Sequence, residues 1–380
     1  MHMVDHIKLF SDIIQIQTVN DHEAELADYL ASYFDGTPAE VTKVTFAPGR
    51  DSLVVKLGEL QNPDKVLVFS GHGDTVDFGD LSKWTYPPLS AHIEGDTIFG
   101  RGANDMKGGL AALFAAALEL IAEDFDFGHN QLKLFMTVGE ETGEYGAHQL
   151  VEAGFLDDVT ALILGEPRAN FEIGYTNKGV IDYKVTVTGK SAHSSRPDLG
   201  DNALEKALVI IQDIQTYFTK YDTVENPVLG KLTNVISVIN SGTQVNQVPD
   251  LAYFMGNTRT IPETPNQQIF ADLQALVDQY DNAELEIIYP AEPLPVQTVS
   301  EFTKLAQAKI QAISGQPGAL IAGAGANEGS EFIQAKAKFP ILIFGPSAFD
   351  NSHAVNESNS LKIYEQAVEI YKQIAVEYLA

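Results

Sequence analysis

Four short apolar segments of this chain each lead into side chains that can bind a metal ion. The side chains that follow them are His72, Glu140 with Glu141, Glu166, and His353. Carboxylates packed together repel one another, and a bound cation removes that repulsion. The chain has no cysteine, so a metal site must use histidine and carboxylate ligands, which are typical of zinc, manganese or cobalt in hydrolytic sites. The pattern therefore predicts a metal-dependent hydrolytic site.

Asp105 adds a further candidate ligand from the glycine-rich segment 100–109, immediately before an expected helix. An isolated Asp at this place is typical of a helix N-cap. Beside the other motifs we interpret it as a ligand.

Glu140 is adjacent to a ligand but is not needed as one. We interpret it as the general base, which takes a proton from water and passes it to the leaving nitrogen. The alternative is an ordinary solvated carboxylate.

The apolar segments predict the elements that position these residues. Continuous apolar runs are typical of strands buried on both faces, and they occur at residues 66–69, 132–138, 161–164 and 339–344. Helical spacing occurs at residues 4–16, at residues 22–33 and after Gly109. Strands separated by helices predict an α/β fold, with a mostly parallel mixed sheet flanked by helices. Ligands bind such sheets at the carboxyl ends of the strands, where the candidate residues lie.

Residues 178–289 follow a different pattern. Ile181, Tyr183, Val185 and Val187 alternate with polar residues, which is typical of a strand with one wet face. The expected order of elements is βαββαβ, that of a ferredoxin-like two-layer sandwich. A chain of 380 residues also favours two domains. We therefore predict a discontinuous catalytic domain, residues 1–177 and 290–380, with residues 178–289 inserted.

Composition narrows the classes of partner. The formal net charge of −28 argues against a nucleic-acid partner. No apolar run is long and charge-free enough to span a bilayer, and the first residues lack a signal-peptide pattern. We expect a cytoplasmic protein that acts on a small molecule, with neither nucleic acid nor membrane as a partner.

These motifs resemble those of the dinuclear zinc aminoacylase and carboxypeptidase family, which includes acetylornithine deacetylase, succinyl-diaminopimelate desuccinylase and related dipeptidases. The resemblance covers nearly the whole chain. It implies two zinc ions, which cobalt or manganese can replace. One ion would be held by His72 and Glu166, the other by Glu141 and His353, with Asp105 bridging them and often followed by a cis peptide bond. Three ligand carboxylates against these two divalent ions would leave one net positive charge, enough to stabilise a bridging hydroxide, because metal binding lowers the pKa of water to about 7.

The resemblance also implies roles outside the ligand set. Asp74, two residues after the first ligand histidine, would orient that imidazole. His193 matches a histidine that reaches into the active site of a partner subunit and steadies the oxyanion, which implies a homodimer in which the insertion is a lid and dimerisation domain. Asn246 and Arg259 match substrate-binding positions, although an exposed salt bridge explains Arg259 equally well.

The expected activity is hydrolysis of the amide bond of an N-acyl amino acid, with N-succinyl-diaminopimelate as the first candidate substrate. Acetylornithine deacetylation and dipeptide cleavage are the alternatives within the class. The desuccinylases usually carry Gly-Thr-Ser-Asp-Gly-Arg late in the chain, whereas residues 325–331 here read Gly-Ala-Asn-Glu-Gly-Ser-Glu. Glu328 keeps a carboxylate, but Glu331 stands where a cation is usual and would disfavour a succinyl carboxylate if it points inward. A non-catalytic metal-dependent binding protein is the alternative from another class, and the presence of Glu140 argues against it.

Overall fold

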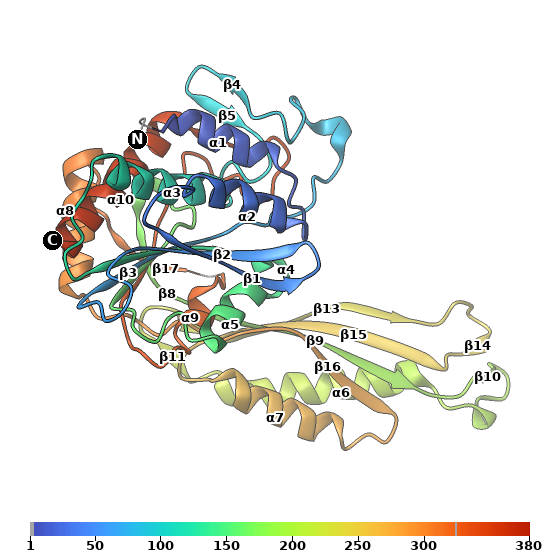
Figure 1. Ribbon diagram of the computed structural model, residues 1–380. Helices are drawn as coiled ribbons and strands as arrows, with labels where there is room; N and C mark the ends of the chain where they lie inside the picture. Colours follow the sequence, from blue (N-terminus) through green and yellow to red (C-terminus); the bar gives the residue numbers. More distant parts are fainter. Residues whose placement is uncertain (1–3, 324) are drawn as a thin grey trace. The chain divides into compact units, whose positions relative to one another are not determined.

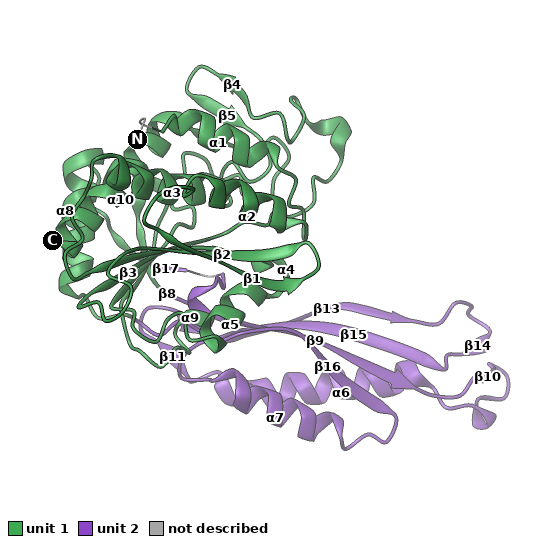
Figure 2. Ribbon diagram, viewed as in Figure 1, with its two compact units in different colours: residues 1–175, 297–321, 331–380 green, residues 176–296, 322–330 purple. Residues whose placement is uncertain are grey.

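The computed structural model describes residues 4–323 and 325–380, and contacts within the chain divide it into two compact units (Figure 2). Unit 1 comprises residues 1–175, 297–321 and 331–380, and unit 2 comprises residues 176–296 and 322–330. The predicted insertion, residues 178–289, falls inside the longer segment of unit 2. Residues 322–330 also group with unit 2, although the sequence analysis assigned them to the catalytic domain.

The main sheet of unit 1 has eight strands in the order β1-β2-β6-β3-β7-β18-β8-β17. The strands are β1 (Glu40–Ala47), β2 (Arg50–Gly58), β3 (Val66–His72), β6 (Gln131–Thr137), β7 (Ala161–Leu164), β8 (Ile173–Asn177), β17 (Leu320–Gly323) and β18 (Ile341–Ile343). The central strands β6, β3, β7 and β18 are parallel to one another, whereas β1, β2 and β8 pair antiparallel. Every residue of β3 and β6 is buried, as continuous apolar runs predict for strands covered on both faces.

Helices cover both faces of this sheet (Figure 1). The longer helices of unit 1 are α1 (His6–Gln15), α2 (Glu23–Ser32), α3 (Lys107–Ala122), α5 (Tyr145–Glu152), α8 (Glu301–Ser314) and α10 (Leu361–Leu379). Helices α1, α2, α3 and α10 lie over one face in Figure 1, and α5 lies under the other. The prediction of a mixed sheet flanked by helices is confirmed.

Short elements complete unit 1. They are α4 (Glu140–Gly143), α9 (Gly329–Phe332, shared with unit 2), the 3-10 helices η1 (Leu81–Lys83) and η2 (Ala169–Phe171), and a small sheet ordered β19 (Ser358–Ser360), β5 (Thr97–Phe99), β4 (His92–Glu94). Within the described residues, no helix is both long and apolar enough to cross a membrane.

Unit 2 contains a four-stranded antiparallel sheet and two long helices. Its sheet has the order β13 (Thr233–Ser241), β15 (Leu251–Thr260), β9 (Gly179–Thr188), β16 (Ala283–Ala291). Helices α6 (Ala203–Phe218) and α7 (Asn266–Val277) bury apolar residues against the alternating inward side chains of β9. The remaining elements are the strand pairs β10 (Ala192–His193) with β14 (Gln247–Val248) and β11 (Glu225–Asn226) with β12 (Gly230–Lys231), and the 3-10 helices η3 (Pro197–Leu199) and η4 (Thr219–Tyr221).

Candidate metal centre

The predicted ligands of unit 1 lie along one edge of its main sheet. Strand β3 ends at His72, Glu141 lies in α4 four residues after the end of β6, and Glu166 lies two residues after β7. Because these strands are parallel, their carboxyl ends meet at the same edge. Asp105 comes from the segment between β5 and α3, and His353 from the segment between β18 and β19.

Asp105 lies between two pairs of ligands. Its Oδ1 is 3.4 Å from His72 Nε2, and its Oδ2 is 3.5 Å from His353 Nε2. Glu166 Oε1 lies 3.8 Å from the same His72 nitrogen, and Glu141 Oε1 lies 3.0 Å from the His353 nitrogen. Two atoms bound to one zinc ion at about 2.0–2.1 Å in tetrahedral geometry lie about 3.3 Å apart. The spacings therefore fit two ions that share Asp105.

Two buried atoms of this cluster lack hydrogen-bond partners in the part of the chain that the structure describes, as atoms that bind a cation would. His72 Nε2 and Glu166 Oε1 have no hydrogen-bond partner among the described residues. His72 Nδ1 donates to the Asp74 carbonyl oxygen at 3.0 Å, so a neutral imidazole presents its Nε2 lone pair to the carboxylates. A lone pair facing buried carboxylates is unfavourable without an intervening positive charge. The residues present thus fit a divalent metal.

The same crowding shifts the protonation of the carboxyl groups. Burial raises the pKa of Glu140 well above its usual value, and the negative charge of Glu166 raises it further while His72 lowers it. Burial, together with the charge of Asp105, raises the pKa of Glu166 to about 7. Burial lowers the pKa of His72, but its contacts with Asp105 and other carboxylates outweigh this, and the net shift is upward. Without a cation the cluster retains protons, which a metal ion displaces.

Asp74 connects two of the ligand-bearing segments. Its carboxylate accepts the backbone N–H groups of Glu140 and Glu141, each at 3.1 Å. The same carboxylate lies 3.6 Å from His72 Nδ1, farther than the Asp74 carbonyl oxygen that accepts from this nitrogen. Asp74 therefore contacts the imidazole mainly through its backbone, and its side chain fixes the start of α4.

The surroundings of Asp105 differ from those of a helix cap. The N-cap of α3 is Met106, and no side chain caps this helix. The Asp105 side chain instead faces the two histidines, and the peptide bond between Asp105 and Met106 is cis.

Glu140 is directed into the same cluster. Its Oε2 lies 4.0 Å from His72 Nε2, and its side chain is 13% exposed. The alternative interpretation, a solvated carboxylate, does not match this burial.

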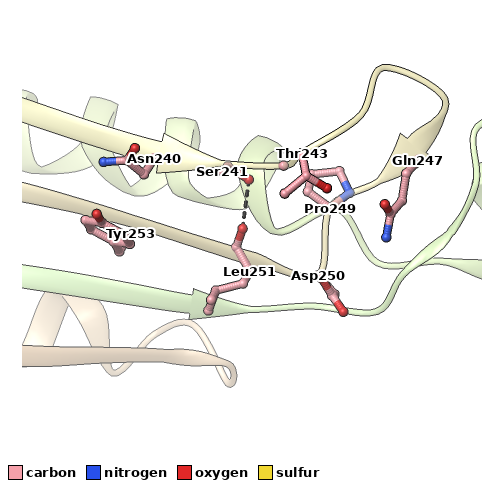
Figure 3. Close-up of a pocket in the computed structure, with 9 residues that line it drawn as sticks. Asn240, Ser241, Thr243, Gln247, Pro249, Asp250, Leu251 and Tyr253 are labelled. Carbon is pink, nitrogen blue, oxygen red and sulfur yellow. Dashed lines mark hydrogen bonds between the residues drawn. The ribbon is translucent and has the colours of Figure 1, made fainter.

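Strands β10 and β14 lie at one end of unit 2 (Figure 1); His193 belongs to β10, and Asn246 directly precedes β14. His193 pairs with Gln247 across β10 and β14, and Ser194 N–H donates to the Asn246 carbonyl oxygen at 3.0 Å. Both predicted residues are exposed. A surface pocket of about 370 Å³ adjoins this pair of strands (Figure 3), and it is lined by Asn240, Ser241, Gly242, Thr243, Gln247, Pro249, Asp250, Leu251 and Tyr253. No predicted metal ligand lines this pocket.

Strand β15 begins at Leu251, close to β14, and Arg259 lies near its far end. Arg259 is eight residues after Leu251, which corresponds to about 27 Å along the strand. Its Nε donates to Asn257 Oδ1 at 3.2 Å, and no ion pair of Arg259 is found within the described part of the chain. Within one chain, Arg259 and the segment that holds Asn246 are too far apart to touch the same small molecule.

Buried polar residues that no sequence motif indicated also surround the ligands. Arg101 and Glu357 form a buried ion pair beside the segments that carry Asp105 and His353. Each lies four residues from a predicted ligand in the sequence. That spacing does not indicate their pairing, because 256 residues separate the two.

Comparison with known proteins now assigns the chain to a family. The model of peptidase family M20/M25/M40 matches residues 68–377. This chain belongs to that family. As an M20 family member it is a metal-dependent hydrolase, which confirms the predicted class of enzyme.

A Staphylococcus aureus protein named "Probable succinyl-diaminopimelate desuccinylase" is 32% identical over 407 aligned residues, which cover 99% of this chain and 98% of that protein.

Solved structures of M20 proteins share the fold. An M20 family metallo-carboxypeptidase from Sulfolobus solfataricus has a TM-score of 0.84 at 18% identity, covering 99% of this chain and all (100%) of that one. A Bacillus subtilis protein described as a dinuclear metal binding peptidase from the M20 family has a TM-score of 0.70 at 15% identity, covering 98% of this chain and 97% of that one.

Proposed function

We propose that this M20 enzyme is a dinuclear zinc-dependent deacylase that hydrolyses N-succinyl-diaminopimelate to succinate and diaminopimelate. The observation that carries the proposal is the Asp105 carboxylate, with one oxygen facing His72 and the other facing His353. The name of the Staphylococcus aureus relative supports the substrate, and the description of the Bacillus subtilis protein supports a two-ion centre.

Five side chains would hold the two ions, namely His72, Asp105, Glu141, Glu166 and His353. When bound, such ions polarise the amide carbonyl and acidify a water molecule. Their positive charge would also lower the pKa of Glu140 from its raised value, which favours the ionised carboxylate. Glu140 then takes a proton from water and passes it to the leaving nitrogen. Asp74 supports this step because it holds the backbone N–H of Glu140.

A homodimer would complete each active site. His193 would donate to the developing oxyanion, and Asn246 and Arg259 would bind the substrate. Because Arg259 and the Asn246 segment lie at opposite ends of β15, a substrate that touches both takes them from two copies. Strand β13 is an edge strand with Val235 and Ile239 exposed on it, which also favours pairing with a second copy.

Glu331 bears on the choice of acyl group. Its Oε2 lies 2.9 Å from His148 Nδ1, and this hydrogen bond raises the pKa of His148 above its usual value. Where His148 is protonated, it offsets the charge of Glu331. The pair reduces the electrostatic penalty that an acidic residue here would impose on a succinyl carboxylate.

The test is a substrate panel assayed with zinc, cobalt and manganese. N-succinyl-diaminopimelate should give a higher kcat/KM than N-acetylornithine or dipeptides, and a reversed order would replace the proposed substrate. Glu140→Gln should retain both metal ions and lose about 10²–10⁴-fold in kcat. Substrate binding without turnover in the parent enzyme would instead indicate a non-catalytic binding protein.

A further inference from the structure

One buried ion pair contacts three of the segments that surround the metal centre. Arg101 Nη1 lies 2.6 Å from Glu357 Oε2, and the two side chains are 2% and 0% exposed. Because Arg101 and Glu357 are 256 positions apart in the sequence, local structure does not explain the pair. The remaining hydrogen bonds of the pair are all with backbone groups.

Glu357 holds the segment from which Asp105 projects. Its Oε1 accepts the backbone N–H of Asn104 at 2.8 Å and that of Asp105 at 2.9 Å. With Arg101 on Oε2, both oxygens of this carboxylate are occupied. The backbone of Asp105 is thus fixed by a charge-assisted contact, the stronger kind of hydrogen bond.

Arg101 holds the segment that carries His353. Its Nη1 donates to the Ala354 carbonyl oxygen at 3.2 Å, and its Nη2 donates to the carbonyl oxygens of His353 at 3.4 Å and Asp77 at 3.0 Å. Asp77 lies five residues after His72. The planar guanidinium can reach all three carbonyl groups at once, which a lysine ammonium on a flexible stem cannot reproduce.

The tryptophan of this chain lies against the same pair. The Arg101 guanidinium carbon lies 5.4 Å from the centre of the Trp84 ring, a cation–π distance. The next residue, Thr85, donates its N–H to Asn356 Oδ1 at 2.6 Å. Because Trp84 is the only tryptophan, its fluorescence reports on this place alone.

We propose that Arg101 and Glu357 are positioning residues that set the separation between Asp105 and His353. They thereby set the affinity for the ion held by Asp105, Glu141 and His353. The His353 side chain is 52% exposed and comes from an irregular segment, whose backbone Arg101 contacts at His353 and Ala354. A ligand held in place before metal arrives loses less conformational freedom on binding. The inference rests on the proposed two-ion centre.

The test is titration of the full metal-free protein with Zn²⁺, followed by calorimetry and Trp84 fluorescence. Glu357→Gln removes the charge that holds the Asp105 backbone. Arg101→Lys keeps a cation beside Glu357 but loses the fork that reaches the carbonyl groups. Both variants should bind the ion held by Asp105, Glu141 and His353 about 10–100-fold less tightly than the parent protein. The other ion should be affected less, because His72 and Glu166 ligate it outside the His353 segment.

Asp158→Asn is the matched control. Asp158 pairs with the buried Lys133 of β6, and Asn there likewise neutralises the carboxylate partner of a buried cation. This variant should lower the melting temperature without changing either Zn²⁺ affinity. The fluorescence change on adding Zn²⁺ should require higher concentrations in the Arg101 and Glu357 variants but not in this control.

Unchanged affinity for both ions in Arg101→Lys and Glu357→Gln would overturn the inference and leave the pair a structural one. The proposed function would survive that result, since the parent protein would still bind two ions. A parent protein that binds no Zn²⁺ would overturn both proposals. If Glu357→Gln fails to fold, Arg101→Lys decides alone, since it keeps the buried charges balanced.

Discussion

Replacing Gly109 with alanine should destabilise this protein, although local helix propensity predicts the opposite. Gly109 lies in the first turn of α3, where the helix passes close to the chain beyond β7. A Cβ atom on Gly109 would lie 1.9 Å from the Gly165 carbonyl oxygen and 2.9 Å from its carbon. The first distance falls about 1.5 Å short of ordinary contact, which begins at 3.4 Å. Both atoms belong to the backbone, so no side-chain rotation relieves the overlap, and α3 must move away from Gly165.

Two opposing terms set the magnitude. Alanine in place of glycine within a helix ordinarily stabilises by about 0.5–1 kcal/mol. Forcing extra volume into a packed interior typically costs about 1–3 kcal/mol. We expect a net loss of about 1–2 kcal/mol and a melting temperature lower by about 2–4 °C for each kcal/mol. Glu166 directly follows Gly165 and Asp105 lies two residues before α3, so the displacement should also weaken zinc binding.

The assay is thermal unfolding of Gly109→Ala with and without Zn²⁺. Gly325→Ala is the control, because a Cβ there meets no atom within 4 Å and its backbone does not require glycine. The control should melt within about 1 °C of the parent protein, as expected for a surface substitution. A Gly109→Ala variant as stable as the parent, or more stable, would refute the close approach of α3 to Gly165.

Three further predictions concern metal, the partner subunit and pH. Removal of zinc with a chelator should lower the free energy of unfolding by about 4 kcal/mol, compared with protein in free Zn²⁺ at about 1,000 times the Kd. Differential scanning calorimetry measures this difference, and an unchanged melting temperature would argue against a bound ion. His193→Ala should lower kcat by about 10²–10³-fold and leave zinc content intact, whereas full activity of this variant or of a stable monomer would refute the cross-subunit role. The hydrogen bond to Glu365 raises the pKa of His6, so the stability it contributes is complete below about pH 6.5 and declines as pH rises through the raised value. The melting temperature of His6→Gln should therefore lie furthest below that of the parent protein in acid, and a difference that grows toward alkaline pH would contradict the assignment.

The sequence was most informative where burial and chemistry coincide. Strands β3, β6 and β7 are continuous apolar runs followed by polar ligand types, so both the strands and the side chains at their ends were predictable. The alternation from Ile181 to Val187 likewise indicated a half-exposed strand, and β9 has that burial pattern.

Other elements were not predicted from the sequence. Strand β1 lies at the edge of the main sheet, and five of its eight residues are exposed. An exposed edge strand lacks the apolar run that marks a central one. Helix α10 was not predicted either, although buried residues such as Tyr364, Val368, Tyr371 and Ala375 recur in it at helical spacing.

Contacts between residues far apart in the sequence could not be predicted for a different reason. Asp74 was expected to orient His72, and its carbonyl oxygen accepts a hydrogen bond from this imidazole, but its carboxylate also accepts the backbone N–H groups of Glu140 and Glu141, which was not foreseen. The pairing of Arg101 with Glu357 depends on how the segment between β5 and α3 contacts the segment between β18 and β19. Neither contact leaves a local pattern in the sequence.

The central claim is that Asp105 stands between two metal ions, and anomalous diffraction at the zinc absorption edge tests it most directly. A crystal of the protein grown with Zn²⁺ should show two anomalous peaks. One should lie about 2.0–2.2 Å from ligand atoms of His72, Asp105 and Glu166, and the other at the same range from Asp105, Glu141 and His353. A map without a peak beside Asp105, or with a single ion that touches only one of its two oxygens, would contradict the claim.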